Sequence, residues 1–150
     1  MIIEVTNEQE MKVFGERLAH LLHGGEVIEL VGDVGSGKTT LTKGLGKGLG
    51  VTEDVQSPSF TISRVYKAAH DLTLAHYDFY RLQEAGIMGQ ELQETILNPK
   101  TVTVIEWGGI VEGALPVDRL TLTIVAPSET LRRIIVEAHG PRSLLIEHAL

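Results

Sequence analysis

Cysteine is missing from all 150 residues, which excludes disulfide bonds, thiolate metal sites and a cysteine nucleophile. Long apolar runs are also missing, and no cationic leader precedes an apolar stretch, so we expect neither a membrane span nor a targeting signal. Basic residues are outnumbered: 13 lysines and arginines face 20 acidic residues, and the net charge is −7. We therefore do not expect this chain alone to bind nucleic acid through a broad positively charged surface, and any RNA would be held by a partner. These absences predict a cytoplasmic protein with no membrane contact.

What remains is the composition of an ordinary soluble globular protein, with 43% apolar and 22% charged residues. The length suits one domain with a substantial core. No internal repeat, low-complexity tract or linker divides the chain. We therefore predict a single domain over residues 1–150.

Residues 32–40 read Gly-Asp-Val-Gly-Ser-Gly-Lys-Thr-Thr and match the phosphate-binding pattern G-x-x-x-x-G-K-[ST] in full. Glycines let the backbone curl so that successive N–H groups point inward at a phosphate chain. Lys38 places a charge on the outer phosphates, Thr39 offers a hydroxyl to Mg²⁺, and the following helix directs its positive end at the anion. The residues predicted to bind the nucleotide are Gly32, Gly35, Ser36, Gly37, Lys38, Thr39 and Thr40.

The flanking segments supply the context that the pattern requires. Residues 26–31 are a short apolar strand, and residues 39–49 carry leucines at helical spacing. Strand, loop and helix thus follow one another in the order of a P-loop. Glycines at positions 44, 46 and 48 each cost about 1 kcal/mol in a helix interior relative to alanine. Either close packing against the sheet requires them or the helix frays early.

Other catalytic signatures are absent. The six histidines are dispersed and no H-E-x-x-H occurs, so zinc hydrolase chemistry has no support. A serine-nucleophile motif also fails, because Ser36 belongs to the phosphate loop. No N-K-x-D motif for guanine recognition occurs, which favours ATP over GTP by elimination.

Apolar periodicity and turn residues place the remaining elements. Thr6 to Gln9 match a helix capping box, and the helix that follows should end at Gly24-Gly25. Packing is the expected role of this helix, and a position of its N-terminal edge near a bound base is the alternative. We predict strands at 2–5, 60–67, 72–80, 101–106, 119–124 and 131–138, and helices at 84–97 and 142–150. Two pairs of these strands form hairpins. The predicted fold is α/β, a P-loop NTPase-like three-layer arrangement whose mixed sheet has a parallel centre and antiparallel hairpins.

Two carboxylates are candidates to hold Mg²⁺ and orient an attacking oxygen. Asp78 lies near the end of a predicted strand, where open α/β sheets bind ligands. A strand-end aspartate satisfied by nearby amides explains its position equally well. Glu106 follows Val102-Thr103-Val104-Ile105, a largely apolar strand that is the better match to the second nucleotide motif, and a nearby metal would compensate its burial. We favour a functional role for Glu106 on that argument.

Several neighbours of these acids have two interpretations each. Ser57, Ser59 and Thr61 lie on a proline-stiffened loop that can approach the γ-phosphate as a switch, although ordinary turn chemistry explains them as well. Arg81 is able to neutralise phosphate, but a surface ion pair is the commoner arrangement. Trp107 can stack on a ligand or cap a core.

Four segments occur together in this short chain: residues 32–40, 57–60 (Ser-Pro-Ser-Phe), 76–82 (His-Tyr-Asp-Phe-Tyr-Arg-Leu) and 106–107 (Glu-Trp). The combination closely resembles the bacterial TsaE (YjeE) family of small P-loop ATPases, and the resemblance covers most of the chain. That family takes part in making threonylcarbamoyladenosine, a modified base beside the anticodon of tRNA. The resemblance implies an ATP-binding and hydrolysing subunit that acts with TsaB and TsaD, and that contacts tRNA only indirectly through these partners.

Carried over by position, the resemblance implies ATP on the phosphate loop and Mg²⁺ at Thr39 and Glu106, with Asp78 as a functionally required aspartate beside them. The implied catalytic residues are Lys38, Asp78 and Glu106. Ser59 stands where the family commonly has threonine, a departure that keeps the hydroxyl.

Two other functions stay open on the residues alone. A small-molecule kinase shares the phosphate loop but needs an acceptor pocket and usually a closing lid, and no lid insertion is obvious. A nucleotide-gated binding module would switch partners and hydrolyse little. Phosphate transfer to a metabolite, or tight ATP-dependent association without turnover, would distinguish these from an ATPase.

Overall fold

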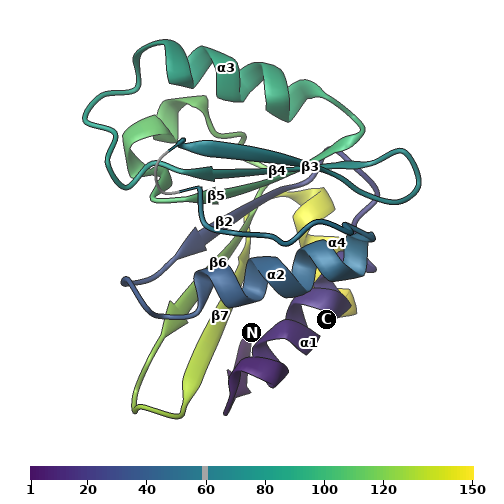
Figure 1. Cartoon of the computed structure of the whole chain (residues 1–150), viewed down its shortest axis with the longest axis vertical. Helices are drawn as coiled ribbons and strands as arrows, with labels where there is room; N and C mark the ends of the chain where they lie inside the picture. Colours follow the sequence, from purple (N-terminus) through teal and green to yellow (C-terminus); the bar gives the residue numbers. More distant parts are fainter. Residues whose placement is uncertain (59–60) are drawn as a thin grey trace.

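A seven-stranded sheet organises the computed structural model, which describes residues 1–58 and 61–150 (Figure 1). The strand order across the sheet is β1-β7-β6-β2-β5-β4-β3. The strands are β1 (Ile2–Val5), β2 (Val27–Val31), β3 (Ser63–Lys67), β4 (Thr73–Asp78), β5 (Thr101–Glu106), β6 (Leu120–Val125) and β7 (Arg132–Ala138).

The centre of the sheet is parallel and its edges are antiparallel. Strand β2 pairs in parallel with both β5 and β6, and β4 pairs in parallel with β5. The hairpins β3–β4 and β6–β7 and the edge pair β1–β7 are antiparallel. The predicted mixed sheet with a parallel centre and two hairpins is confirmed. Its central strands are apolar because both faces are covered.

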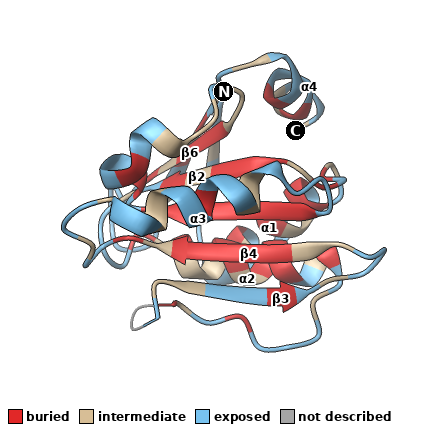
Figure 2. Cartoon of the chain, turned by 90° about the horizontal axis from the view of Figure 1, so that it is seen from above, coloured by how far each residue is buried: buried red, intermediate tan, exposed pale blue. Residues whose placement is uncertain are grey.

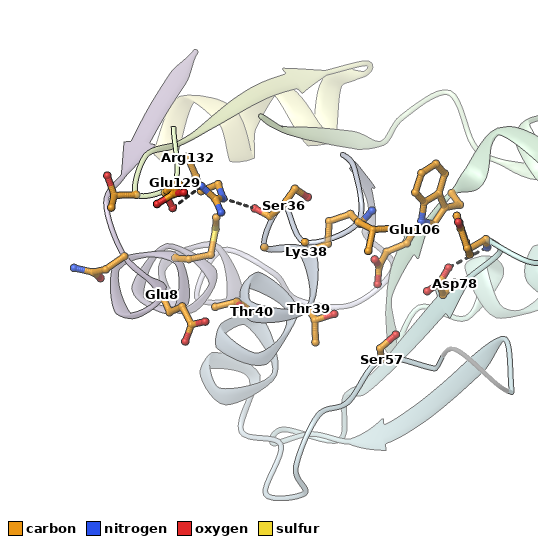
Figure 3. A pocket seen from close by; sticks show the side chains of 18 of the residues that line it. Glu8, Ser36, Lys38, Thr39, Thr40, Ser57, Asp78, Glu106, Glu129 and Arg132 are labelled. Carbon is orange, nitrogen blue, oxygen red and sulfur yellow. Dashed lines mark hydrogen bonds between the residues drawn. The ribbon is translucent and has the colours of Figure 1, made fainter. Parts of the chain in front are cut away.

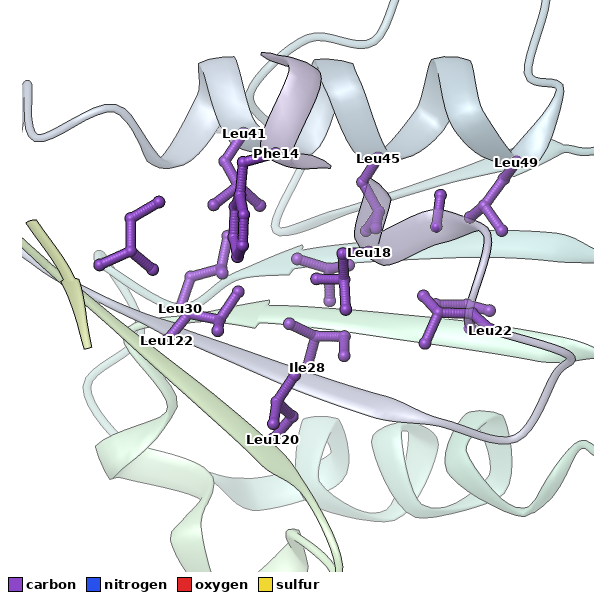
Figure 4. Packing of buried hydrophobic residues seen from close by; sticks show 14 of the residues in the cluster. Phe14, Leu18, Leu22, Ile28, Leu30, Leu41, Leu45, Leu49, Leu120 and Leu122 are labelled. Atoms are coloured by element: carbon purple, nitrogen blue, oxygen red, sulfur yellow. The ribbon is translucent and has the colours of Figure 1, made fainter. Parts of the chain in front are cut away.

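Helices cover the sheet from both sides and complete three layers (Figure 2). Helices α1 (Glu8–Ala19) and α2 (Lys38–Leu49) pack on one face, and their leucines join those of β2 and β6 in one buried cluster (Figure 4). Helix α3 (Gly86–Leu97) and the 3₁₀ segment η1 (Gly108–Ala114) cover β4 and β5 on the other face. The last helix, α4 (Pro141–Ala149), packs Ile146 into the first cluster.

Two of the three glycines of α2, Gly44 and Gly48, face helix α1. A Cβ atom at Gly44 would lie 2.2 Å from the carbonyl oxygen of Lys12, and one at Gly48 would lie 2.6 Å from the Cβ of Ala19. The helix is continuous through Leu49, so it does not fray. The expected close packing is confirmed, but at these two positions the partner is a neighbouring helix, because α1 and α2 lie against each other on the same face of the sheet.

The start of α1 corrects the predicted capping box. Asn7, with extended backbone angles of φ −159° and ψ 172°, is the N-cap, and its side chain accepts a hydrogen bond of 2.8 Å from the backbone N–H of Glu10. Thr6 instead donates its hydroxyl to the Glu10 carboxylate. The N-cap is therefore shifted by one residue, because threonine and asparagine are both good caps and the sequence offers them side by side.

The predicted end of α1 at Gly24-Gly25 is wrong: the helix ends at Ala19, because the N–H groups of Leu21 and Leu22 bond three residues back in tighter turns. Other boundaries differ by a few residues from the predicted ones. Strand β3 begins at Ser63, because Thr61 and Ile62 donate to the carbonyl of Pro58 in a turn that places Ile62 at φ 67°. The residues predicted to open that strand, 59–60, lie outside the described residues. Helix α3 begins at Gly86 and α4 at Pro141, and Asn98 ends α3 as expected.

Candidate nucleotide-binding site

A cavity of about 780 Å³ opens at the carboxyl ends of β2, β4 and β5 (Figure 3). Parallel strands point their carboxyl ends to one edge, and open α/β sheets bind ligands there. All but one of the predicted site residues line this cavity: Gly35, Ser36, Gly37, Lys38, Thr39, Thr40, Asp78 and Glu106. Segments separated by up to 70 residues in the chain therefore meet in one place.

Gly32 is the predicted site residue that does not line the cavity. A Cβ atom there would lie 2.6 Å from the Ser36 hydroxyl oxygen and 2.8 Å from the carbonyl oxygen of Ile124. Its absence of a side chain lets the base of the loop fit against strand β6. The role that the geometry gives Gly32 is close packing beneath the loop.

The loop turns into α2 through Gly37, which has φ 113° and is the N-cap of the helix. L-residues with side chains rarely adopt this angle, so glycine is required. No side chain caps this helix start. The first backbone N–H groups of α2 are therefore left for an anion, to which the helix dipole also contributes.

Lys38 is 6% exposed, and its ammonium donates to the carbonyl oxygens of Gly32 and, at 3.5 Å, of Asp33. Its Nζ also lies 4.4 Å from the centre of the Trp107 ring. Within the described part of the chain, no carboxylate pairs with this ammonium. A buried cation that has only dipoles and a ring face around it is a favourable partner for an incoming anion.

Glu106 ends strand β5 and is 3% exposed. Its Oε2 atom lies 2.6 Å from Nε2 of His76, which is fully buried on the adjacent strand β4. In residues 1–58 and 61–150, this is the only hydrogen bond of the Glu106 side chain. The Glu106 carboxylate is therefore bound by His76 on the neighbouring strand, and the residue also lines the cavity.

Asp78 stands directly beside Glu106, because the two residues are register partners on β4 and β5. Its Oδ1 accepts a hydrogen bond of 3.0 Å from the backbone N–H of Tyr80. Burial raises the pKa of Asp78, and the negative charge of Glu106 adds to this, against the opposing effects of the Tyr80 N–H, His76 and Lys38. Asp78 thus accepts a backbone hydrogen bond at the end of its strand and also lines the cavity.

Trp107 and Tyr80 form an aromatic wall beside the two acids. Their ring centres are 5.0 Å apart, and Trp107 is 38% exposed with a left-handed backbone at φ 55°. The indole lines the cavity and faces Lys38, so it does not cap a core. The sequence singled out Trp107, but nothing in the pattern marked Tyr80 as its partner.

The opposite end of the cavity is built by the start of α1 and by the turn between β6 and β7 (Figure 3). Asn7, Glu8 and Met11 come from α1, as expected for an N-terminal edge near the ligand. Arg132 is the first residue of β7, directly after the turn, and its Nε donates to the carbonyl of Ser36 at 3.2 Å. Sequence reasoning missed Arg132 because a lone arginine at the start of a strand carries no pattern.

The proposed switch loop is only partly brought to the cavity. Ser57 lines it, whereas the Thr61 hydroxyl is used in a hydrogen bond of 3.0 Å to the carbonyl of Ser63. Ser59 lies outside the described residues. Arg81 is exposed and lines the cavity.

The described residues contain no group of three or more histidine, aspartate or glutamate side chains arranged to hold a metal ion. A metal at this site would therefore share its coordination with another ligand. In the same part of the chain, no helix has the length and apolar character needed to cross a bilayer.

The fold and the loop between β2 and α2 define the class of P-loop NTPase-like proteins. A family described as "Threonylcarbamoyl adenosine biosynthesis protein TsaE" matches residues 5–135 of the chain. The chain belongs to this TsaE family, whose members take part in tRNA threonylcarbamoyladenosine biosynthesis.

Individual relatives agree with the family match. A tRNA threonylcarbamoyladenosine biosynthesis protein TsaE from Streptomyces coelicolor is 46% identical, over 88% of this chain and 93% of its own. The protein of the same name from Bacillus subtilis is 36% identical, over 91% of this chain and 84% of its own. The crystal structure of Bacillus subtilis YdiB superposes with a TM-score of 0.82 at 31% identity, over 99% of this chain and 93% of that one.

Proposed function

We propose that this protein binds Mg·ATP and hydrolyses it as a subunit of the tRNA threonylcarbamoyladenosine machinery, together with TsaB-like and TsaD-like proteins. The observation that supports this is the meeting of the phosphate loop with Asp78 and Glu106 in one cavity. A phosphate loop alone can bind any phosphate ligand. A phosphate loop that shares its cavity with two carboxylates can also hold a metal ion and support a reaction at the terminal phosphate.

The donors at this end of the cavity fit Mg²⁺. Thr39 offers a hydroxyl, and Asp78 and Glu106 offer carboxylates, which are the hard oxygen ligands that Mg²⁺ prefers. Mg²⁺ usually takes one or two carboxylates together with substrate phosphates, which agrees with the lack of a protein-only metal cluster among the described residues. The bound ion would neutralise charge on the phosphates.

The chain's own groups then have separate tasks. The backbone N–H groups at the start of α2 and the Lys38 ammonium bind and orient the phosphates. Glu106 and Asp78 face the terminal phosphate and position the attacking water. The Trp107 and Tyr80 rings exclude bulk water from that end, which strengthens the electrostatic contacts.

ATP titration and phosphate release test the activity directly. Wild-type protein should bind Mg·ATP, and Lys38→Ala should lose affinity, whereas Asp78→Ala and Glu106→Ala should lose turnover more than binding. Unchanged hydrolysis in all three variants, with partners present, would overturn the proposal. Transfer of phosphate to a metabolite in place of water would favour a kinase.

The partner assignment has its own test. Immobilised protein should retain TsaB-like and TsaD-like proteins from a cell extract when ATP is present, and retain less of them when nucleotide is removed. Lys38→Ala protein, which cannot respond to ATP, is the matched control. Retention of neither partner under any nucleotide condition would contradict this part of the proposal.

A further inference from the structure

His76 is a buried histidine with no task in the functions proposed so far. It lies on β4, is 0% exposed, and does not line the cavity. Its Nε2 lies 2.6 Å from Oε2 of Glu106, while its Nδ1 is buried without a hydrogen-bond partner among the described residues. The ring is therefore anchored through one nitrogen only.

This one-sided bonding determines which ring nitrogen carries the hydrogen. A hydrogen on Nε2 is accepted by the carboxylate, and a bare Nδ1 has only an unused lone pair. A hydrogen on Nδ1 would instead be buried without an acceptor. The geometry thus assigns the Nε2–H tautomer, which donates to Glu106.

The contact also determines what Glu106 can do. His76 on the neighbouring strand engages Oε2, and Glu106 lines the cavity that Lys38 and Thr39 also line, so Oε1 is the oxygen left for a ligand. In the described residues Lys38 makes no ion pair with Glu106, although both border the same space. Without His76 the carboxylate would lose the only hydrogen bond that its side chain makes among the described residues.

We propose that His76 is a positioning residue that holds Glu106 in the orientation needed to bind the Mg²⁺ of the bound nucleotide. The proposal rests on the proposed ATP site and adds a residue to it. Groups that orient a metal ligand from behind typically change metal affinity about 10-fold to 100-fold when they are removed.

Three variants test this without relying on turnover. His76→Leu removes the donor, and His76→Gln keeps an N–H donor at the end of a side chain of similar reach. Thr103→Val is the matched control, because Thr103 is also buried on β5 and its hydroxyl has no partner in the described structure. Affinity for Mn²⁺ is measured by electron paramagnetic resonance with saturating ATP analogue, and nucleotide affinity is measured separately in excess chelator.

His76→Leu should weaken Mn²⁺ binding about 10-fold or more and leave metal-free nucleotide affinity unchanged. His76→Gln should recover most of the Mn²⁺ affinity, and Thr103→Val should match the wild type. Wild-type Mn²⁺ affinity in His76→Leu would overturn the proposal. So would a parallel loss of metal-free nucleotide affinity, which marks a general structural defect.

Nitrogen-15 NMR of the wild-type histidines provides a measurement that does not depend on any variant folding. The Nε2 of His76 should carry the hydrogen both without ligand and with Mg²⁺ and the ATP analogue. The opposite tautomer would contradict the proposal. Failure of the wild type to bind nucleotide at all would refute the ATP site, and the unliganded NMR spectrum would still report on His76.

Discussion

Two glutamates are almost completely buried at opposite ends of the central parallel strands, and their hydrogen-bond partners differ. Glu26 is 6% exposed just before β2, and Glu106 is 3% exposed at the end of β5. Because β2 and β5 run in parallel, one acid lies at the amino edge and the other at the carboxyl edge. At both positions, burial removes a carboxylate from water, which costs free energy unless hydrogen bonds or opposite charges compensate it.

Glu26 is satisfied by three donors. Its carboxylate accepts from the backbone N–H of His23 at 2.9 Å, from that of Gly24 at 2.7 Å, and from the Arg142 guanidinium at 3.0 Å. Glu106 has the single contact with His76 within the described residues, and it borders a cavity. A fully bonded buried acid stabilises a chain junction, whereas an under-bonded one beside a cavity is ready to take a ligand.

Glu106→Gln should produce the largest change in this comparison. The amide keeps the size of the side chain but removes the charge at the terminal phosphate, so we expect ATP hydrolysis to fall about 1000-fold, or about 4 kcal/mol. The free energy of unfolding should change little. Phosphate release measured with partners present checks the first expectation, and urea denaturation checks the second.

Glu26→Ala should show the reverse pattern. Two backbone N–H groups and a guanidinium lose their acceptor, and we expect a loss of about 3 kcal/mol in the free energy of unfolding. Arg142 is half exposed, which keeps the cost at the low end for a buried pair. Nucleotide affinity measured by calorimetry on the folded protein should match the wild type. If Glu26→Ala instead lost ATP hydrolysis without losing stability, the proposed difference in role between Glu26 and Glu106 would be wrong.

Lys38→Ala removes the cation that lines the same cavity as Glu106. Removing the ammonium should weaken nucleotide binding by about 2 kcal/mol, or roughly 30-fold. Trp107 is the sole tryptophan and lies 4.4 Å from this ammonium, so its fluorescence reports the titration. Lys47→Ala is the control, because Lys47 lies on the same helix and pairs with Glu16 at the surface. Equal affinity of both variants would exclude a phosphate-binding role for Lys38.

Asp118→Asn should give the smallest effect, again at the amino edge. Its carboxylate accepts from the backbone N–H groups of Arg142 at 2.9 Å and Ser143 at 3.0 Å, at the start of α4. Burial raises the pKa of Asp118, but the hydrogen bonds of Ser143 and Arg142 and the arginine charge outweigh it, so the pKa lies below the ordinary 3.8. We expect the substitution to cost about 1 kcal/mol at neutral pH.

The pH dependence of that cost follows from the sign of the pKa change. A carboxyl with a lowered folded-state pKa contributes its full stability above the unfolded value of 3.8 and loses it as the pH falls through the folded value. The difference between wild type and Asp118→Asn should therefore shrink below pH 3.8. Urea denaturation at neutral and acidic pH measures it. A constant difference at both pH values would mean that the charge contributes nothing.

Much of the fold followed from local patterns. Apolar periodicity located the strands and helices, and the pairs around residues 68–71 and 126–131 formed the expected hairpins. Boundaries were less accurate where two good caps adjoin, as at Thr6 and Asn7. The row of glycines in α2 was ambiguous, because Gly44 and Gly48 are required by the close approach of α1, which precedes them by more than 20 residues in the chain.

The candidate site divides in a similar way. The phosphate loop, Asp78 and Glu106 were recognisable from residue type and spacing. Arg132, Tyr80 and the bond between His76 and Glu106 were not, because each depends on which strands become neighbours and in what register.

Short-range chemistry was enough to predict a phosphate loop, the absence of thiol chemistry and the membership of a family, since these depend on residues close together or on composition. Only the tertiary structure decided that Glu106 has one donor among the described residues, and that the Arg142 guanidinium joins the two local N–H donors of Glu26. The physical reason is that burial and hydrogen-bond satisfaction are properties of neighbours in space. The 30-residue separation between His76 and Glu106 is closed by parallel pairing of β4 and β5, which no local pattern encodes.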